Sequence, residues 1–194
     1  MSATPPGNRT ACARLEEALE ARSNSRQIVS EAAVQAALDR IADAASPVLA
    51  HANPLVLAVM QGGVFTAVEL CRRFDFPYEF DFIHLTRYGA SLTGGQINWR
   101  ALPSSALEGR TLLLVDDILD HGITLAALYE ELGKSGASQL YSAVLVSKRI
   151  EGAGRRVAVD FVGLEIEDAY VFGCGMDFKG YWRGLTALYA LEVT

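Results

Sequence analysis

The stretch LLLVDDILDHGIT, residues 112–124, joins an apolar run to three acidic residues, a glycine and a threonine. Its first four residues, 112–115, are typical of a strand that is covered on both faces of a parallel sheet. Residues 123–135 are predicted to form a helix, ended by Gly136. The stretch therefore predicts a strand–turn–helix unit with acids at the carboxyl end of the strand, where open α/β sheets bind their ligands.

Strands and helices alternate on both sides of this unit. Apolar, β-branched and aromatic runs predict further strands at residues 55–60, 78–86, 140–146 and 159–163. Helices are predicted at residues 64–73 and after Ser30, a plausible N-cap. The buried face of this second helix is predicted to hold Val34, Leu38, Ile41 and Ala45. The alternation predicts an α/β fold, with an open, mostly parallel twisted sheet flanked by helices on both faces.

The two ends of the chain depart from this alternation. Residues 1–11 are polar and carry prolines, which predicts a disordered tail before a short helix at residues 14–21 that breaks at residues 23–25. The C-terminal segment is rich in aromatic residues and punctuated by glycines, which predicts a small lobe over the sheet. We therefore divide the chain into an N-terminal tail and short helix (1–27), a core domain (28–165) and a C-terminal hood (166–194).

The composition excludes several classes of function. The chain has 194 residues, 51% of them hydrophobic, which suffices for one well-packed domain. A formal charge of −6 argues against a nucleic-acid partner. No apolar run approaches the ~20 residues that cross a bilayer, so no membrane partner is expected. Its three cysteines lack metal-like spacing, which favours unpaired thiols in a reducing compartment and predicts a cytoplasmic protein.

The acids and the turn of the central stretch offer two kinds of contact. Asp116 and Asp117 can accept hydrogen bonds from hydroxyls or bind a metal. The turn that follows leads into the helix at residues 123–135, whose free N–H groups favour an anion. A sugar phosphate would satisfy both, but two alternatives remain open. The acids could hold magnesium beside a phosphorylated aspartate, as in receiver domains, although there the pair lies near the chain start; or they could merely cap the helix.

Four motifs resemble those of one enzyme family. VDDILDHGIT closely resembles the phosphoribosyl-pyrophosphate motif of type I phosphoribosyltransferases, and Asp120 is typical of the purine members. VMQGG (59–63) resembles their pyrophosphate loop, which contains a non-proline cis peptide. TRYGASLTGG (86–95) resembles the flexible loop that closes over the site. DAYVFGCGMDFKGYWR (168–183) resembles the purine-binding hood of hypoxanthine-guanine phosphoribosyltransferases.

This resemblance implies a purine salvage enzyme. It would transfer the 5-phosphoribosyl group of 5-phosphoribosyl-1-pyrophosphate (PRPP) to N9 of a 6-oxopurine, hypoxanthine or guanine, giving IMP or GMP and pyrophosphate. The implied cofactor is Mg²⁺, and the implied assembly is a homodimer or homotetramer. The sequence leaves the preference among hypoxanthine, guanine and xanthine open. These bases differ at C2, and the family often contacts the C2 edge with backbone carbonyls, which side-chain identity does not reveal.

The resemblance also implies roles for individual residues of the central motif and the two loops. Asp116 and Asp117 would hold the ribose hydroxyls, directly or through Mg²⁺, and Asp120 would be the catalytic residue that faces N7 of the purine. The 5′-phosphate would be bound by Asp120, His121, Gly122, Ile123 and Thr124. Pyrophosphate would be bound by Gln61, Gly62 and Arg183. The flexible loop would contribute Arg87 and Tyr88.

Four further residues are assigned by resemblance to the base side of the site. Lys148 would contact the six-oxo group, and Tyr170 would stack on the purine ring. Val171 would read the base through its backbone. Asp177 would bind a second Mg²⁺ beside the base, so the implied metal ligands are Asp116, Asp117 and Asp177.

Three positions depart from the family pattern. Gln61 stands where many relatives have lysine, and Ala169 where a basic residue is frequent. His121 replaces a common threonine and so removes a hydroxyl donor. The loss of two cations predicts weaker PRPP binding than in close relatives. The departures also keep a second hypothesis open, a ligand-sensing regulator on the same fold whose catalysis is weakened.

Overall fold

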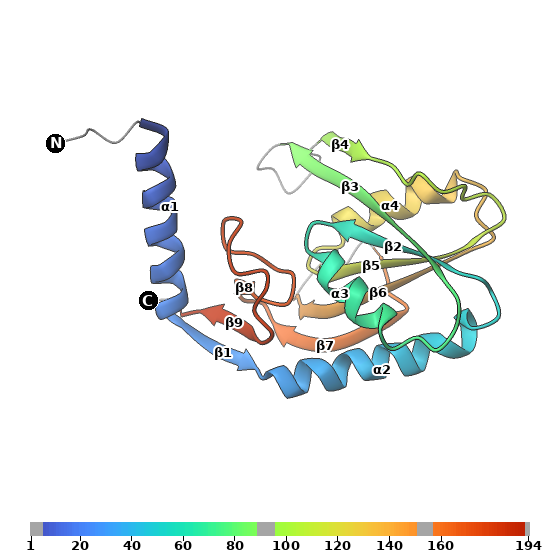
Figure 1. Ribbon diagram of the computed structural model, residues 1–194, viewed down its shortest axis with the longest axis horizontal. Helices are drawn as coiled ribbons and strands as arrows, with labels where there is room; N and C mark the ends of the chain where they lie inside the picture. The colour runs from blue at the N-terminus through green and yellow to red at the C-terminus, as the bar shows by residue number, and fades with distance from the viewer. Residues whose placement is uncertain (1–5, 89–95, 151–156, 193–194) are drawn as a thin grey trace.

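The computed structural model describes residues 6–88, 96–150 and 157–192 of the chain. Its centre is a six-stranded sheet in the order β4-β3-β2-β5-β6-β7 (Figure 1). The strands are β2 (Leu55–Met60), β3 (Glu79–Tyr88), β4 (Gln96–Ala101), β5 (Thr111–Leu119), β6 (Gln139–Arg149) and β7 (Phe161–Glu167). All neighbours pair in parallel except β3 and β4, so the predicted open, mostly parallel sheet is confirmed.

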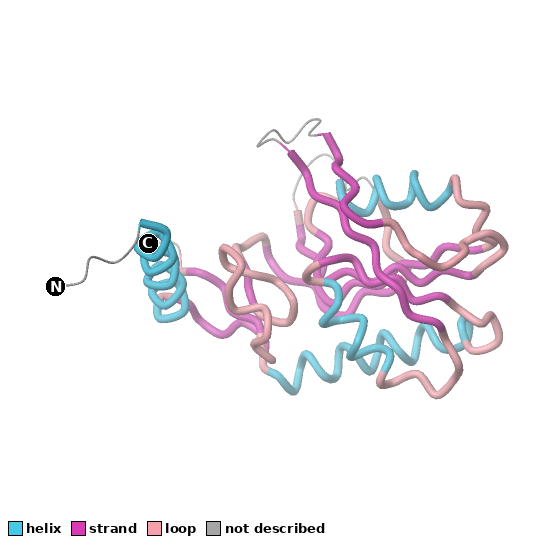
Figure 2. Tube along the Cα trace, turned by 45° about the horizontal axis from the view of Figure 1, so that its top comes forward, coloured by secondary structure: helices cyan, strands magenta, loops and turns pink. Residues whose placement is uncertain are grey.

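Helices cover both faces of this sheet, as Figure 2 shows. Helices α2 (Glu31–Leu49) and α3 (Gly63–Cys71) pack on one face, where β2 contributes Val56 and Ala58. Helix α4 (Ile123–Gly133) packs on the other face, where β2 contributes Leu55 and Leu57. Because successive strand residues point to opposite faces, a continuous apolar run supplies both cores at once.

The long helix α2 forms as the sequence predicts. The Ser30 hydroxyl accepts a hydrogen bond of 3.3 Å from the backbone N–H of Ala33 and so caps the helix. The predicted apolar face is buried throughout, at Val34, Leu38, Ile41 and Ala45. In the described stretches, no helix combines the length and the apolar composition needed to span a bilayer.

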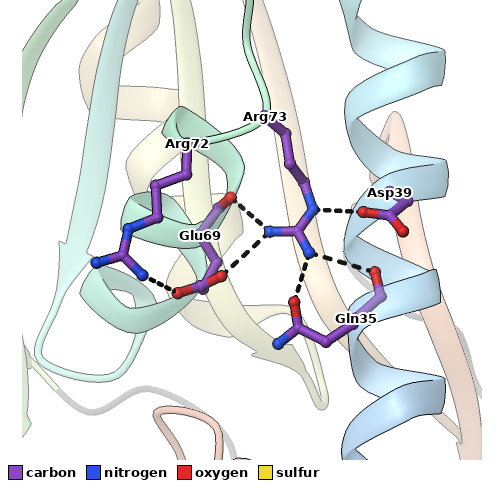
Figure 3. A network of polar contacts seen from close by, with 5 residues as sticks. All are labelled: Gln35, Asp39, Glu69, Arg72 and Arg73. Atoms are coloured by element: carbon purple, nitrogen blue, oxygen red, sulfur yellow. Dashed lines mark hydrogen bonds and ion pairs between the residues drawn. The ribbon is translucent and has the colours of Figure 1, made fainter.

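A network of charged side chains joins α2 to the end of α3 (Figure 3). The Arg73 guanidinium donates to Asp39 at 2.7 Å and to Glu69 at 3.1 Å. It also donates to the side-chain oxygen of Gln35 at 2.5 Å, and Arg72 adds an ion pair of 2.8 Å to Glu69. The network fixes the C-terminal end of α3, whose N-terminal end borders the site described below.

The small lobe is a second, three-stranded antiparallel sheet in the order β1-β9-β8. Its strands are β1 (Ser25–Val29), β9 (Leu188–Leu191) and β8 (Val171–Phe172). Two of them come from the predicted aromatic lobe, but β1 comes from the N-terminal region and had not been predicted. The lobe therefore joins both ends of the chain.

Several predicted boundaries are wrong. Helix α1 (Pro6–Ser23) includes residues that had been assigned to a disordered tail. β5 continues to Leu119, so the paired acids lie inside the strand instead of after it. β7 begins and ends later in the chain than the strand predicted at residues 159–163, and β4 had not been predicted.

One buried carboxylate ties the connection between β4 and β5 to the sheet. Asp81 of β3 is 8% exposed. It accepts hydrogen bonds of 2.7–3.0 Å from the backbone N–H groups of Phe82, Ser104 and Ser105 and from both serine hydroxyls. Burial acts to raise the pKa of Asp81, but these hydrogen bonds outweigh burial and lower the pKa to about 2.

Asp81→Asn should lower the free energy of unfolding by about 2.5 kcal/mol at pH 7, because the folded-state pKa lies below the unfolded value of about 3.9. This stabilisation is fully present above about pH 5 and is lost as the pH falls toward 2, so the variant and the wild type should converge in acid. Urea unfolding at pH 7 measures the full difference, and at pH 3 the difference should have fallen to about half. Asp75→Asn, which removes an exposed carboxylate, is the control; equal stability of Asp81→Asn and wild type at pH 7 would contradict the prediction.

Candidate active site

A cleft of about 650 Å³ opens at the carboxyl ends of β2, β5 and β6, beneath the small lobe. Each predicted site residue whose side chain is described lines this cleft: Gln61, Gly62, Asp116, Asp117, Asp120, His121, Gly122, Ile123, Thr124, Lys148, Tyr170, Val171, Asp177 and Arg183. The position agrees with the rule that open α/β sheets bind ligands at the carboxyl ends of their strands. The structure thus brings these residues together, while their roles remain predictions.

Arg87 and Tyr88, predicted to begin the flexible loop, instead belong to β3, where their backbones pair with Ile97 and Gln96. Their side chains and residues 89–95 lie outside the described part of the chain.

The paired acids Asp116 and Asp117 are buried, with exposed fractions of 8% and 9%. The backbone N–H of Asp117 donates to the Asp116 carboxylate at 2.9 Å. Burial and the neighbouring charge of Asp117 raise the pKa of Asp116 well above its usual value. Burial also raises the pKa of Asp117, against the opposing effects of the Asp116 hydrogen bond and the Arg183 charge. A cation or a hydroxyl donor that enters the cleft would therefore stabilise the charged form of this pair.

The acid pair fits a magnesium ion that is shared with a substrate. Its donors are carboxylate oxygens, the ligand type that Mg²⁺ prefers. Within the described residues, no three acidic, histidine or cysteine side chains gather closely enough to hold a metal alone. Substrate oxygens and water would have to complete the coordination shell, which is how Mg²⁺ is commonly held in phosphate sites.

The loop after β2 lies against these acids. The Met60–Gln61 peptide is cis, as the resemblance to a pyrophosphate loop implied. A Cβ atom at Gly62 would collide with the Asp117 carboxylate, and one at Gly175 would collide with the carbonyl oxygen of Gly62. Glycine at these two positions therefore allows the loop, the strand β5 and the small lobe to meet at one point.

The turn from β5 into α4 has the geometry of an anion site. Gly122 adopts the left-handed conformation, with φ of 72°, and provides no side-chain cap for α4. The first N–H groups of the helix are therefore left for a ligand, and the helix dipole favours a negative one. Thr124, in the first turn, adds a hydroxyl to the same cleft. The His121 ring is half exposed, with Nδ1 3.1 Å from Asp120 Oδ1.

A cation lies among carboxylates on the base side of the cleft. Lys148 Nζ is 3.0 Å from Asp168 Oδ1 and 3.8 Å from Asp120 Oδ1, and only 13% of the lysine side chain is exposed. Asp120 Oδ1 is shielded from solvent and has no hydrogen-bond partner among the described residues. The sequence interpretation assigned no role to Asp168. Its position at the start of the hood motif, facing the end of β6, becomes visible only in three dimensions.

The small lobe presents an aromatic ring and an ion pair to the cleft. The Tyr170 side chain is 51% exposed, and its hydroxyl donates to the backbone oxygen of Asp177 at 3.2 Å. Arg183 Nη2 and Asp177 Oδ1 form an ion pair of 2.6 Å. Arg183 also donates to the side-chain oxygen of Gln61 at 3.4 Å. A lysine at position 61 would place a second cation beside Arg183. In this chain Gln61 is neutral, and Arg183 supplies the positive charge at this point of the cleft.

The sequence interpretation did not name the apolar side chains of the cleft. Val59, Leu85, Ile118 and Met176 line it beside the polar groups. The signal of Val59, Leu85 and Ile118 is indistinguishable from that of core residues, because they belong to the same apolar runs that build the sheet.

Comparison with known proteins identifies the family. Residues 25–179 match the phosphoribosyl transferase domain family. The hypoxanthine-guanine-xanthine phosphoribosyltransferase of Tritrichomonas foetus is 30% identical over 140 residues, which cover 72% of this chain and 76% of that protein. The hypoxanthine-guanine phosphoribosyltransferase of Bacillus subtilis (strain 168) is 31% identical over 140 residues, or 72% of this chain and 77% of that protein.

The fold comparison agrees with the sequence comparison. A solved structure of a hypoxanthine-guanine-xanthine phosphoribosyltransferase matches with a TM-score of 0.78 and 26% sequence identity, covering 87% of this chain and 97% of the other. The segment that matches the family contains the six-stranded sheet, the acid pair and the turn before α4. The chain therefore belongs to the phosphoribosyl transferase domain family, as a type I phosphoribosyltransferase.

Proposed function

We propose that this phosphoribosyltransferase acts on PRPP and a 6-oxopurine, hypoxanthine or guanine, to form IMP or GMP and pyrophosphate. The observation that carries the proposal is the position of Lys148 beside Asp120, in the same cleft as the exposed Tyr170 ring. A cation, a carboxylate and an aromatic ring can together bind the oxygen, the ring nitrogen and the face of a 6-oxopurine.

The phosphoribosyl side of the proposal rests on the acid pair and the α4 N-terminus. The 5′-phosphate would accept hydrogen bonds from the first N–H groups of α4 and from Thr124. The ribose hydroxyls would donate to Asp116 and Asp117, whose burial in β5 holds them rigidly. One magnesium, held by these two acids together with substrate oxygens, and a second, held by Asp177, would neutralise charge on the departing pyrophosphate.

The base side has a distinct task for each residue. In the reaction the bond from C1 of the ribose to N9 of the base forms while the bond to pyrophosphate breaks, and positive charge develops on the sugar. An ionised aspartate is a weak base but a good hydrogen-bond acceptor, so Asp120 would hold the purine at N7 and stabilise that charge. The Lys148 ammonium would donate to a six-oxo group and disfavour the amino group of adenine.

We also propose assembly as a homodimer or homotetramer. Four large apolar side chains of α3 and β3 are 39–45% exposed, namely Phe65, Val68, Phe80 and Phe82. Exposed apolar groups of this size favour association. The molar mass from light scattering tests this proposal, and a monomer at micromolar concentration would refute it.

The reaction is tested by steady-state pyrophosphate release with PRPP, Mg²⁺ and each of hypoxanthine, guanine, xanthine, adenine and uracil. Turnover with hypoxanthine or guanine should exceed turnover with adenine and uracil at least about 100-fold, because adenine would present an amino group to Lys148 and uracil lacks the ring nitrogen that Asp120 would hold. Preference for adenine or uracil would overturn the base assignment. Absence of turnover in a folded protein that still binds PRPP would instead indicate a sensor.

A further inference from the structure

The residues at 177–183 form a tight hairpin that carries two cleft residues at its ends. Phe178 and Tyr181 exchange backbone hydrogen bonds of 3.0 and 2.9 Å across it. Asp177 and Arg183, at the two ends, line the cleft and pair with each other. Between them Lys179 and Trp182 have φ of 50° and 70°, in the left-handed region that non-glycine residues occupy only when their surroundings hold them there.

Helix α1 provides those surroundings on the side of the hairpin away from the cleft. The indole N–H of Trp182 donates to the carbonyl oxygen of Ala18 at 2.7 Å. Arg14 donates to the backbone oxygen of Lys179 at 2.9 Å, and the Lys179 ammonium pairs with Glu17 at 2.7 Å. Ala18 has no exposed surface at this contact. Both left-handed residues are thus bonded directly to α1.

Beyond the hairpin, α1 contacts the small lobe, where the Arg22 guanidinium carbon lies 3.9 Å from the centre of the Tyr189 ring. Figures 1 and 2 show α1 beside the small lobe and away from the six-stranded sheet. Its apolar residues Leu15 and Leu19 remain 47% and 53% exposed. The helix also precedes the segment 25–179 that matches the family, and Trp182 and Arg183 follow that segment. The contact between α1 and the hairpin therefore joins a helix that precedes the matched segment to a hairpin at that segment's C-terminal end.

We propose that α1 is a positioning element for the cleft. Trp182 is the positioning residue, because its bond to α1 fixes the hairpin that carries Asp177 and Arg183. The inference rests on the proposed function, in which Asp177 would hold magnesium, and on the pyrophosphate-binding role that the family resemblance implies for Arg183. Loss of the contact should impair binding of PRPP more than binding of the base. Val171 lies in β8, which is paired with β9, and Tyr170 contacts the hairpin through its hydroxyl bond to the Asp177 backbone and its ring contact with Phe178. The base side is therefore coupled to the hairpin less directly than Asp177 and Arg183, which are part of it.

Trp182→Phe keeps an aromatic ring in place and removes the N–H that reaches Ala18. It should raise KM for PRPP about 5-fold and change KM for hypoxanthine less than about 2-fold, as expected for one lost hydrogen bond.

Glu17→Lys and Lys179→Glu should each raise KM for PRPP about 2- to 3-fold, and the double variant should return it toward the wild-type value. Trp99→Phe, in β4, is the matched control and should change neither constant.

Backbone hydrogen exchange of the hairpin provides a readout that does not need turnover. Exchange in residues 177–183 should accelerate in Trp182→Phe and not in Trp99→Phe, while the β5 and β6 amides keep their protection. Unchanged exchange together with unchanged KM would overturn the inference. Faster exchange with unchanged KM for PRPP would overturn the role in binding. A wild-type protein without turnover would refute the proposed function, and the exchange experiment would still decide whether α1 holds the hairpin.

Discussion

Asp120→Asn should lower kcat for hypoxanthine about 100- to 1,000-fold and leave KM for PRPP nearly unchanged. Asp120 Oδ1 is shielded from solvent and lies 3.1 Å from His121 Nδ1 and 3.8 Å from Lys148 Nζ. An amide removes the negative charge that would stabilise the developing positive charge on sugar and base. Because the amide has nearly the same size, the cradle formed by residues 120–124 should persist.

Asp168→Asn is the matched control for that charge. Asp168 is the other carboxylate near Lys148, at 3.0 Å, but its side chain is 60% exposed and it is absent from the lining of the cleft. Its replacement should change kcat less than about 3-fold, as is usual for an exposed ion pair. Steady-state kinetics of the two variants, with PRPP binding measured by calorimetry, separates the roles. An Asp120→Asn variant that keeps more than about a tenth of the wild-type kcat would limit Asp120 to binding.

The sheet could be predicted because each of its central strands carries its own signal. Residues 55–60 and 112–115 are apolar without interruption, a pattern that suits only strands buried on both faces. β1 gave no such signal. Its five residues mix polar and apolar side chains, and its partner β9 lies at the opposite end of the chain. Pairing across that separation depends on the folded lobe, so local sequence does not reveal it.

The predicted boundaries of helices and strands are wrong where contacts with neighbouring elements determine the backbone conformation. β5 continues through Asp116 and Asp117 although two adjacent acids are unfavourable in a buried strand. Pairing with β6 and the close approach of the loop at Gly62 hold that backbone in place. Pro6 at the first position of α1 is a recognised helix-start signal, yet the polar composition around it favoured a tail.

The cleft residues were found by their motifs, whereas their partners required the structure. Four motifs and the separate Lys148 supplied the predicted side chains, and the described ones meet in one cleft. The Gln61–Arg183 contact joins residues of two motifs, and the Lys148–Asp168 contact joins a residue outside the motifs to one of them. A motif fixes the order of residues along the chain, but distances between motifs depend on how the lobe sits on the sheet.

Gly62→Ala should lower kcat/KM for PRPP about 100-fold, the loss expected when a binding group moves by about 1 Å. The backbone at Gly62 has φ of −67° and ψ of −41°, which alanine adopts without strain. The effect therefore arises from the added methyl group, which would occupy the place of the Asp117 carboxylate and press on the backbone oxygen of Gly175. Either Asp117 turns away from the substrate, or the loop separates from β5 and the small lobe.

Gly133→Ala is the control that isolates this contact, because a Cβ atom there meets nothing within 4 Å. It lies at the end of α4, where alanine favours the helix, so stability should rise by up to about 1 kcal/mol and kcat/KM should not change. Gly62→Ala should lose about 1–3 kcal/mol of stability from overpacking, too little to account for a 100-fold loss of activity in a protein that stays folded. If kcat/KM falls less than about 3-fold, Asp117 can move without cost, and its role in holding the ribose must be given up.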